Sequence, residues 1–136
     1  MTLRDTDVEP TGSSLKNRRV VLGVTGGIAA VETVRLARAL RREGADLLVI
    51  MTPSAQRIIT PLAVRWASQA EVITDWDGDL SALNKADAVL VAPATRDAMA
   101  SHVHGLQHGP LMMALSVARS RNTPTLFAPS MHVDLA

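Results

Sequence analysis

Short apolar runs of strand length alternate with helical segments along most of the chain. The four clearest runs cover residues 19–24, 46–51, 87–92 and 124–128. Each run is almost continuously apolar, which is typical of a strand buried on both faces of a parallel sheet. Parallel strands need crossover connections, and helices normally supply them. The alternation therefore predicts an α/β fold, a Rossmann-like doubly wound parallel sheet in a single domain.

The segments between these runs have helical periodicity. Helices are expected over residues 28–42, 55–69, 96–104 and 110–120. The second of these segments should be broken near Pro61, because proline interrupts a helix interior. A short strand at residues 72–73 and one helical turn at residues 81–85 complete the expected order of elements.

Length and composition favour one domain with a single core. The chain has 136 residues, of which 47% are hydrophobic, and that is enough for one small α/β domain. Residues 1–17 carry few apolar side chains and predict a disordered lead, so the folded domain is expected at residues 18–136. The chain ends soon after the fourth run with no closing helix, and we expect a C-terminal part to be missing from this sequence.

Charge and residue usage argue against several classes of protein. The 14 basic and 13 acidic residues give a net charge of +1, and aromatic residues make up only 2%. Neither a basic field nor a stacking surface for nucleic acid is therefore expected. No apolar run approaches the roughly 20 residues of a membrane helix. The polar, acidic start is unlike a signal peptide, and the absence of cysteine fits a cytoplasmic protein.

The histidine and aspartate clusters do not predict a metal site. His102, His104 and His108 fall at i, i+2 and i+6, and this set as a whole does not follow the i, i+4 spacing of a helical metal pair. A solvated helix end is the simpler interpretation. The acidic loop at residues 75–79 lacks the remaining pattern of a calcium loop.

The residues that follow the four runs point to a phosphate-bearing ligand. The turns are Thr25-Gly26-Gly27, Thr52-Pro53-Ser54, Pro93-Ala94-Thr95 and Pro129-Ser130. Each turn alone is typical of ordinary turn chemistry, but parallel strands bring all four to one edge of the sheet, where ligands bind. The full dinucleotide fingerprint is missing, and Thr52 stands where a ribose-binding acid would be. FMN, which has one phosphate and no adenosine, fits better than NAD.

Several of these segments resemble one known family. Residues 21–30 (VLGVTGGIAA), 49–55 (VIMTPSA), 86–95 (ADAVLVAPAT) and 128–131 (APSM) are similar, in the same order, to motifs of the homo-oligomeric flavin-containing cysteine decarboxylases. That family includes phosphopantothenoylcysteine decarboxylase and the peptide aminovinyl-cysteine decarboxylases. The resemblance spans residues 18–132 and is specific for the family, though not for the substrate.

The resemblance implies a cofactor, an assembly and a set of site residues. It implies homo-trimers or dodecamers that hold FMN between subunits and oxidatively decarboxylate a cysteine at the end of a peptide or small molecule to an enethiol. The positions that correspond to FMN contacts are Gly26, Gly27, Ile28, Thr52, Ser54, Pro93, Ala94 and Thr95. The positions on the substrate side are Asp97, Met131 and His132.

Two departures from the family motifs bear on catalysis. Asp79 stands where the family has its active-site histidine, eight residues before Asp87, and His132 replaces the asparagine that grips the substrate carboxylate. We take Asp79 and His132 as the candidate catalytic residues. A peptide substrate is favoured by the drift of the substrate-side motifs. The alternatives are phosphopantothenoylcysteine decarboxylation in coenzyme A biosynthesis and a non-catalytic, FMN-binding regulatory flavoprotein.

Overall fold

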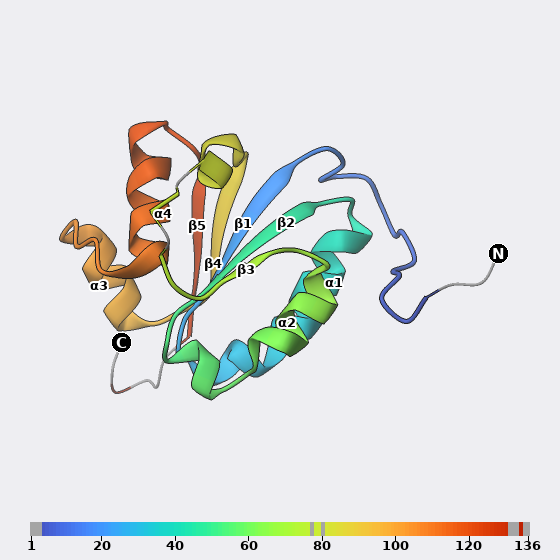
Figure 1. The fold of residues 1–136 in the computed structure, drawn as a ribbon, viewed down its shortest axis with the longest axis horizontal. Coiled ribbons are helices and arrows are strands. Elements are labelled where there is room, and N and C mark those ends of the chain that lie inside the picture. Colours follow the sequence, from blue (N-terminus) through green and yellow to red (C-terminus); the bar gives the residue numbers. More distant parts are fainter. Residues whose placement is uncertain (1–3, 77, 80, 131–133, 135–136) are drawn as a thin grey trace.

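The predicted strands lie side by side in one parallel sheet. The computed structural model describes residues 4–76, 78–79, 81–130 and 134. Its strands are β1 (Arg19–Val24), β2 (Asp46–Met51), β3 (Val72–Ile73), β4 (Ala88–Ala94) and β5 (Thr125–Pro129). They are arranged in the order β3-β2-β1-β4-β5, and every pair is parallel (Figure 1). The chain order reverses between β1 and β4, which confirms the doubly wound α/β prediction.

Helices cover both faces of this sheet. One face carries η1 (Ile28–Glu32), α1 (Thr33–Arg42), η2 (Ala55–Arg57) and α2 (Pro61–Ser68), and the other carries η3 (Ser81–Lys85), α3 (Arg96–Val103) and α4 (Gly109–Ser120) (Figure 1). In the described part of the chain no helix is long and apolar enough to cross a membrane.

The central strands are apolar throughout because each of their faces has its own core. Val21 and Leu48 are fully buried in the cluster that contains Leu115 of α4. The next residues along the strands, Leu22 and Val49, are fully buried in the cluster on the α1 and α2 side. Successive side chains of a strand point to opposite faces, so a strand covered on both sides needs apolar residues at every position. This is the physical origin of the runs seen in the sequence.

Two boundaries differ from the prediction by more than one residue. The segment 28–42 begins with the 3-10 turn η1, and the regular helix α1 starts only at Thr33. Gly27 precedes η1 and has no side chain to cap it, so a tight first turn satisfies the early amides instead. Strand β4 continues through Pro93 and Ala94, which the sequence placed in its exit loop. A proline lacks the N–H but keeps its carbonyl, and the Pro93 carbonyl accepts from β1's exit residue Thr25.

The described part of the lead lies along the C-terminal end of α1. Residues 4–17 contain no helix or strand. Thr11 donates its backbone N–H to the Arg42 carbonyl (3.1 Å), and Leu15 donates to the Glu43 carbonyl (2.9 Å). The Arg41 guanidinium donates to the Thr6 carbonyl at 2.8 Å. Disorder of residues 1–17 in solution stays a prediction.

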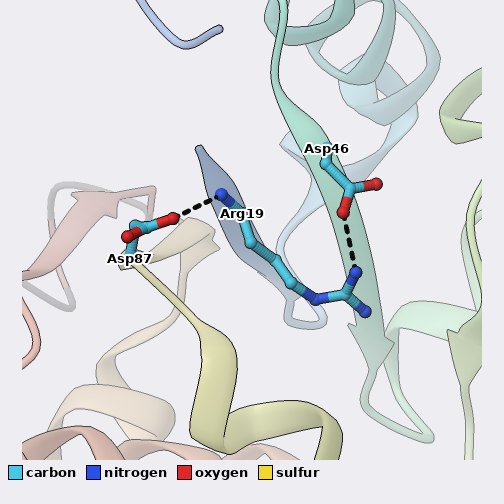
Figure 2. Close-up of polar contacts among 3 residues, drawn as sticks. All are labelled: Arg19, Asp46 and Asp87. Carbon is cyan, nitrogen blue, oxygen red and sulfur yellow. Dashed lines mark hydrogen bonds and ion pairs between the residues drawn. The ribbon is translucent and has the colours of Figure 1, made fainter. Parts of the chain in front are cut away.

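Arg19 connects the start of β1 to the starts of the neighbouring strands β2 and β4 (Figure 2). Its backbone N–H donates to the Asp87 carboxylate at 2.7 Å, and its Nη1 donates to the Asp46 carboxylate, also at 2.7 Å. Asp46 begins β2 and Asp87 directly precedes β4. One residue of β1 therefore fixes the start of both neighbouring strands.

The two carboxylates of this network should differ in importance. The Asp46 side chain is 67% exposed, and exposed ion pairs contribute less than about 1 kcal/mol. Asp87 accepts a backbone N–H, and a charge-assisted bond of this kind contributes about 1–2 kcal/mol when half exposed. We expect Asp87→Ala to lower the free energy of unfolding more than Asp46→Ala in urea titrations. Equal losses, or the reverse order, would contradict this account of the edge.

Candidate functional site

A buried threonine joins the ends of β1 and β4 at the point where the chain order reverses. Thr25 is 2% exposed. Its hydroxyl donates to the Pro93 carbonyl at 2.6 Å and accepts the backbone N–H of Thr95 at 3.0 Å. The Thr25 backbone N–H also donates to the Pro93 carbonyl, at 3.3 Å. In an open parallel sheet this switch point is where ligands bind, and Thr25 holds its two loops in fixed register.

The loop after β2 packs against the loop after β1. Thr52 donates its backbone N–H to the Val24 carbonyl at 3.0 Å, and its hydroxyl accepts the Ala55 N–H at 3.2 Å. A β-carbon added to Gly26 would collide with the Ser54 side chain. The approach of these two loops therefore requires glycine at position 26.

A cavity of about 480 Å³ opens between these loops and the start of α4. This volume lies within the range of small-molecule sites. Five of the residues expected to bind cofactor or substrate line it, namely Gly26, Thr52, Ser54, Thr95 and Asp97. Met51, Leu111 and Met112 add apolar surface. A lining that combines hydroxyl groups and a close-packed glycine with apolar side chains suits a ligand that has both an anionic group and a flat apolar ring.

The amides of this cavity could hold a phosphate. Within the described residues, the backbone N–H groups of Gly26 and Ser54 donate to no protein acceptor. The Ser54 hydroxyl lies beside Gly26. Backbone N–H groups and hydroxyls are the donors that loops of parallel sheets offer to phosphate groups.

One of the remaining predicted cofactor residues, Pro93, lines a second cavity. It measures about 410 Å³ and lies between α1 and the ends of β4 and β5, where Pro93 is one of its walls. A β-carbon built on Gly27 would lie 3.4–3.5 Å from the Ser130 carbonyl oxygen and the Pro93 ring, which is ordinary van der Waals contact. Ile28 is 76% exposed and Ala94 is fully buried; neither of them lines either cavity.

Asp79 does not line the cavity of about 480 Å³, which we call the switch-point cavity. It lines a neighbouring cavity of about 270 Å³ beside β3 and η3. Its carboxylate accepts the Ser81 backbone N–H at 2.8 Å. Hydrogen bonds from the Ser81 backbone and then from the Ser81 side chain lower the pKa of Asp79 below its ordinary value. A carboxylate stabilised in its charged form is a poorer proton acceptor.

The other predicted catalytic residue, His132, and the substrate-side residue Met131 lie outside the described residues. Their assigned roles stay predictions. Within the described residues, no group of three or more acidic or histidine side chains could hold a metal ion.

His108 lines the switch-point cavity, although its spacing in the sequence predicted only a solvated helix end. It precedes α4 as its N-cap. Its Nε2 lies 3.2 Å from the hydroxyl of Ser101, which is 4% exposed. The following Gly109-Pro110 pair marks a helix start, and this pair is the signal that could have placed His108 at the ligand-binding edge rather than at a solvated helix end.

Sequence comparisons agree with the fold and with the quoted motifs. The family model described as Flavoprotein matches residues 8–135. The coenzyme A biosynthesis bifunctional protein CoaBC of Thermococcus kodakarensis is 37% identical over 125 residues, which cover 87% of this chain and 31% of that protein. CoaBC of Bacillus subtilis is 35% identical over 129 residues, covering 89% of this chain and 31% of that protein. The chain thus spans about a third of the length of these relatives.

Solved structures show the same architecture. The FMN-dependent cysteine decarboxylase TvaF from thioviridamide biosynthesis has a TM-score of 0.75 at 25% identity, with 87% of this chain and 76% of TvaF covered. The FMN-dependent cysteine decarboxylase SpaF has a TM-score of 0.78 at 23% identity, with 89% of this chain and 73% of SpaF covered. The similarity to SpaF shows the fold alone. With the family model matching nearly the whole chain, the protein belongs to the Flavoprotein family.

Proposed function

We propose that this chain binds FMN and belongs to an enzyme that oxidatively decarboxylates a C-terminal cysteine to an enethiol. The observation that carries the proposal is the switch-point cavity, in which Gly26, Thr52 and Ser54 converge beside an apolar wall. The relatives add support, because TvaF and SpaF are named as FMN-dependent cysteine decarboxylases. The relatives also support the enzyme over a non-catalytic regulatory flavoprotein.

The residues of the cavity fit FMN. The N–H groups of Gly26 and Ser54, with the nearby hydroxyls, would hold its phosphate, and Met51 and Leu111 would border its ring. When bound, FMN supplies the two-electron oxidation of the cysteinyl side chain. The protein contributes the position of the substrate, the exclusion of water and the handling of protons. Gly27, Ile28, Pro93 and Ala94 are the further positions proposed to contact the cofactor, and Pro93 lines the second cavity.

The substrate side of the site is assigned to Asp97, Met131 and His132. Asp97 lines the switch-point cavity, so it is in position to contact a ligand there. A histidine at position 132 could bind the carboxylate that is lost as carbon dioxide. Asp79 is less well supported, because it borders a separate cavity and its charged form is stabilised.

A peptide ending in cysteine is the substrate proposed first. It is supported by the drift of the family motifs at Asp97 and His132, each of which stands where the family has asparagine, and by the structural similarity to TvaF. Phosphopantothenoylcysteine is the second candidate, and the identity of 37% to CoaBC favours it. Incubating the purified full-length protein with each compound separates them. The true substrate loses the mass of one carbon dioxide and two hydrogens if the enethiol is released. It loses one carbon dioxide alone if the hydrogens are returned. Retained FMN with no turnover of either compound would favour the regulatory flavoprotein.

His132→Ala tests the assigned substrate contact. We expect it to reduce turnover by roughly 100-fold or more, since removing a group that orients the substrate costs this much, while the visible spectrum still shows bound FMN. Turnover at the wild-type rate would remove His132 from the site.

The proposed assembly is a homo-trimer or a dodecamer acting in the cytoplasm. Several large apolar side chains are exposed on the single chain, among them Ile28 (76%), Val31 (54%) and Leu126 (64%). Contact with a second copy would remove such surface from water. Light scattering of the full-length protein measures the assembly directly.

A further inference from the structure

Of the described residues that line the switch-point cavity, two carry an ionisable side chain. They are Asp97, at the start of α3, and His108, before α4; all other described lining residues are apolar, hydroxyl-bearing or glycine. Any proton that a ligand gains or loses in this part of the site passes through one of these two groups or through water.

A contact with α3 holds the His108 ring in place. Its Nε2 lies 3.2 Å from the Ser101 hydroxyl, and Ser101 is buried in α3, which packs against α4. The backbone then turns through Gly109, whose φ of +86° favours glycine, into the proline at the start of α4. When Nε2–H donates to the Ser101 oxygen, the lone pair of Nδ1 remains available as a proton acceptor.

We propose that His108 is the proton-exchanging side chain of this cavity and takes the role that sequence resemblance assigns to position 79. The inference rests on the proposed decarboxylase function. Asp79 is less suited to that role, because it borders another cavity and the Ser81 hydrogen bonds lower its pKa. A histidine ring can both accept and release a proton, and His108 lines the cavity in which the proposed reaction takes place.

The proton transfer is balanced without any further reactant. The S–H bond of the substrate cysteine breaks, its electron pair stays on sulfur as a thiolate, and a new N–H bond forms on Nδ1 of neutral His108. The resulting imidazolium keeps its Nε2 hydrogen bond to Ser101 and returns the proton to water, since His108 is exposed. Asp97 is the one acidic group among the described lining residues.

A spectroscopic test follows His108 without relying on turnover. Ring 15N signals are recorded on the labelled full-length protein, first with FMN and then with a cysteine-ended peptide added, and His108→Gln assigns the His108 signals. We expect the His108 signals to move on addition of ligand and those of His104 to stay, because His104 does not line the cavity. Bound FMN and bound peptide with unmoved His108 signals would overturn the inference. A protein that binds no FMN would overturn the proposed function instead.

A kinetic test compares two matched variants. His108→Gln should lower kcat by roughly 100-fold or more, the usual contribution of a general base, with FMN content unchanged and the pH profile of kcat altered. His104→Gln makes the same change on the same α3–α4 connection and should behave as wild type. Ser101→Ala, which removes only the positioning hydroxyl, should shift the midpoint of the wild-type profile. Wild-type kcat in His108→Gln would overturn the inference and leave the decarboxylase function standing.

Discussion

Replacing Gly26 with valine should lower the affinity for FMN by about 100-fold. A β-carbon at this position collides with the Ser54 side chain, so the loops after β1 and β2 must separate. Inserting atoms into close-packed contacts of this kind typically costs about 1–3 kcal/mol, and each 1.4 kcal/mol changes affinity tenfold. The separation would also spread the Gly26 and Ser54 amides that are proposed to hold the phosphate. Fluorescence titration of the FMN-free protein with FMN measures the change.

Gly27→Ala provides the comparison for this variant. An ideal β-carbon at Gly27 meets its nearest atoms, in Ser130 and Pro93, at 3.4–3.5 Å, which is ordinary van der Waals contact. The loss of FMN affinity should therefore be much smaller than for Gly26→Val. Equal losses in the two variants, or wild-type affinity in Gly26→Val, would show that the approach of Gly26 to Ser54 does not form the cofactor site.

Thr25→Val should destabilise the fold by about 2–3 kcal/mol and weaken FMN binding as well. Valine keeps the shape of the threonine but removes a hydroxyl that is 2% exposed and bonded to both Pro93 and Thr95. The Thr95 N–H would lose its acceptor, and leaving a buried polar group unpaired costs about 1–3 kcal/mol. Urea titrations give the change in the free energy of unfolding.

Thr33→Val is the matched control for Thr25→Val. Thr33 is equally buried, at 1% exposure, but its hydroxyl donates only to the nearby Ala30 carbonyl in η1. We expect Thr33→Val to lower the free energy of unfolding by about 1 kcal/mol or less. Its effect on FMN binding should also be smaller, because the Thr33 hydrogen bond does not connect two strands. If both variants lost the same stability and kept the same FMN affinity, Thr25 would have no special role at the switch point.

The sheet could be predicted from the sequence because its central strands are covered on both sides. Residues of β1 alternate between the core that contains Leu115 and the core of α1 and α2, so the strand has no polar side chain after Arg19. The helix boundary at Ile28 was less predictable. The apolar spacing of 28–42 continues through η1, and the 3-10 geometry there depends on the uncapped start at Gly27.

The site could be predicted only in part, and for physical reasons. Gly26, Thr52, Ser54 and Thr95 follow strand ends, and the rule that parallel strands end at one edge brings them together. Asp79 was assigned by its spacing from Asp87, but where it lies is set by the path from β3 to η3, which places it in a separate cavity. The spacing of His108 from His102 and His104 bears only on metal binding and gives no position for His108 in the fold. Its position depends on the turn between α3 and α4.

The visible absorption spectrum of the purified full-length protein tests the central claim most directly, since that claim is that the switch-point cavity binds FMN. We predict the absorption bands of an oxidised flavin and the release of FMN, rather than a dinucleotide, when the protein is denatured. A colourless protein that cannot be reconstituted with added FMN would contradict the account, and the loops after β1, β2 and β4 would then have to serve a different ligand.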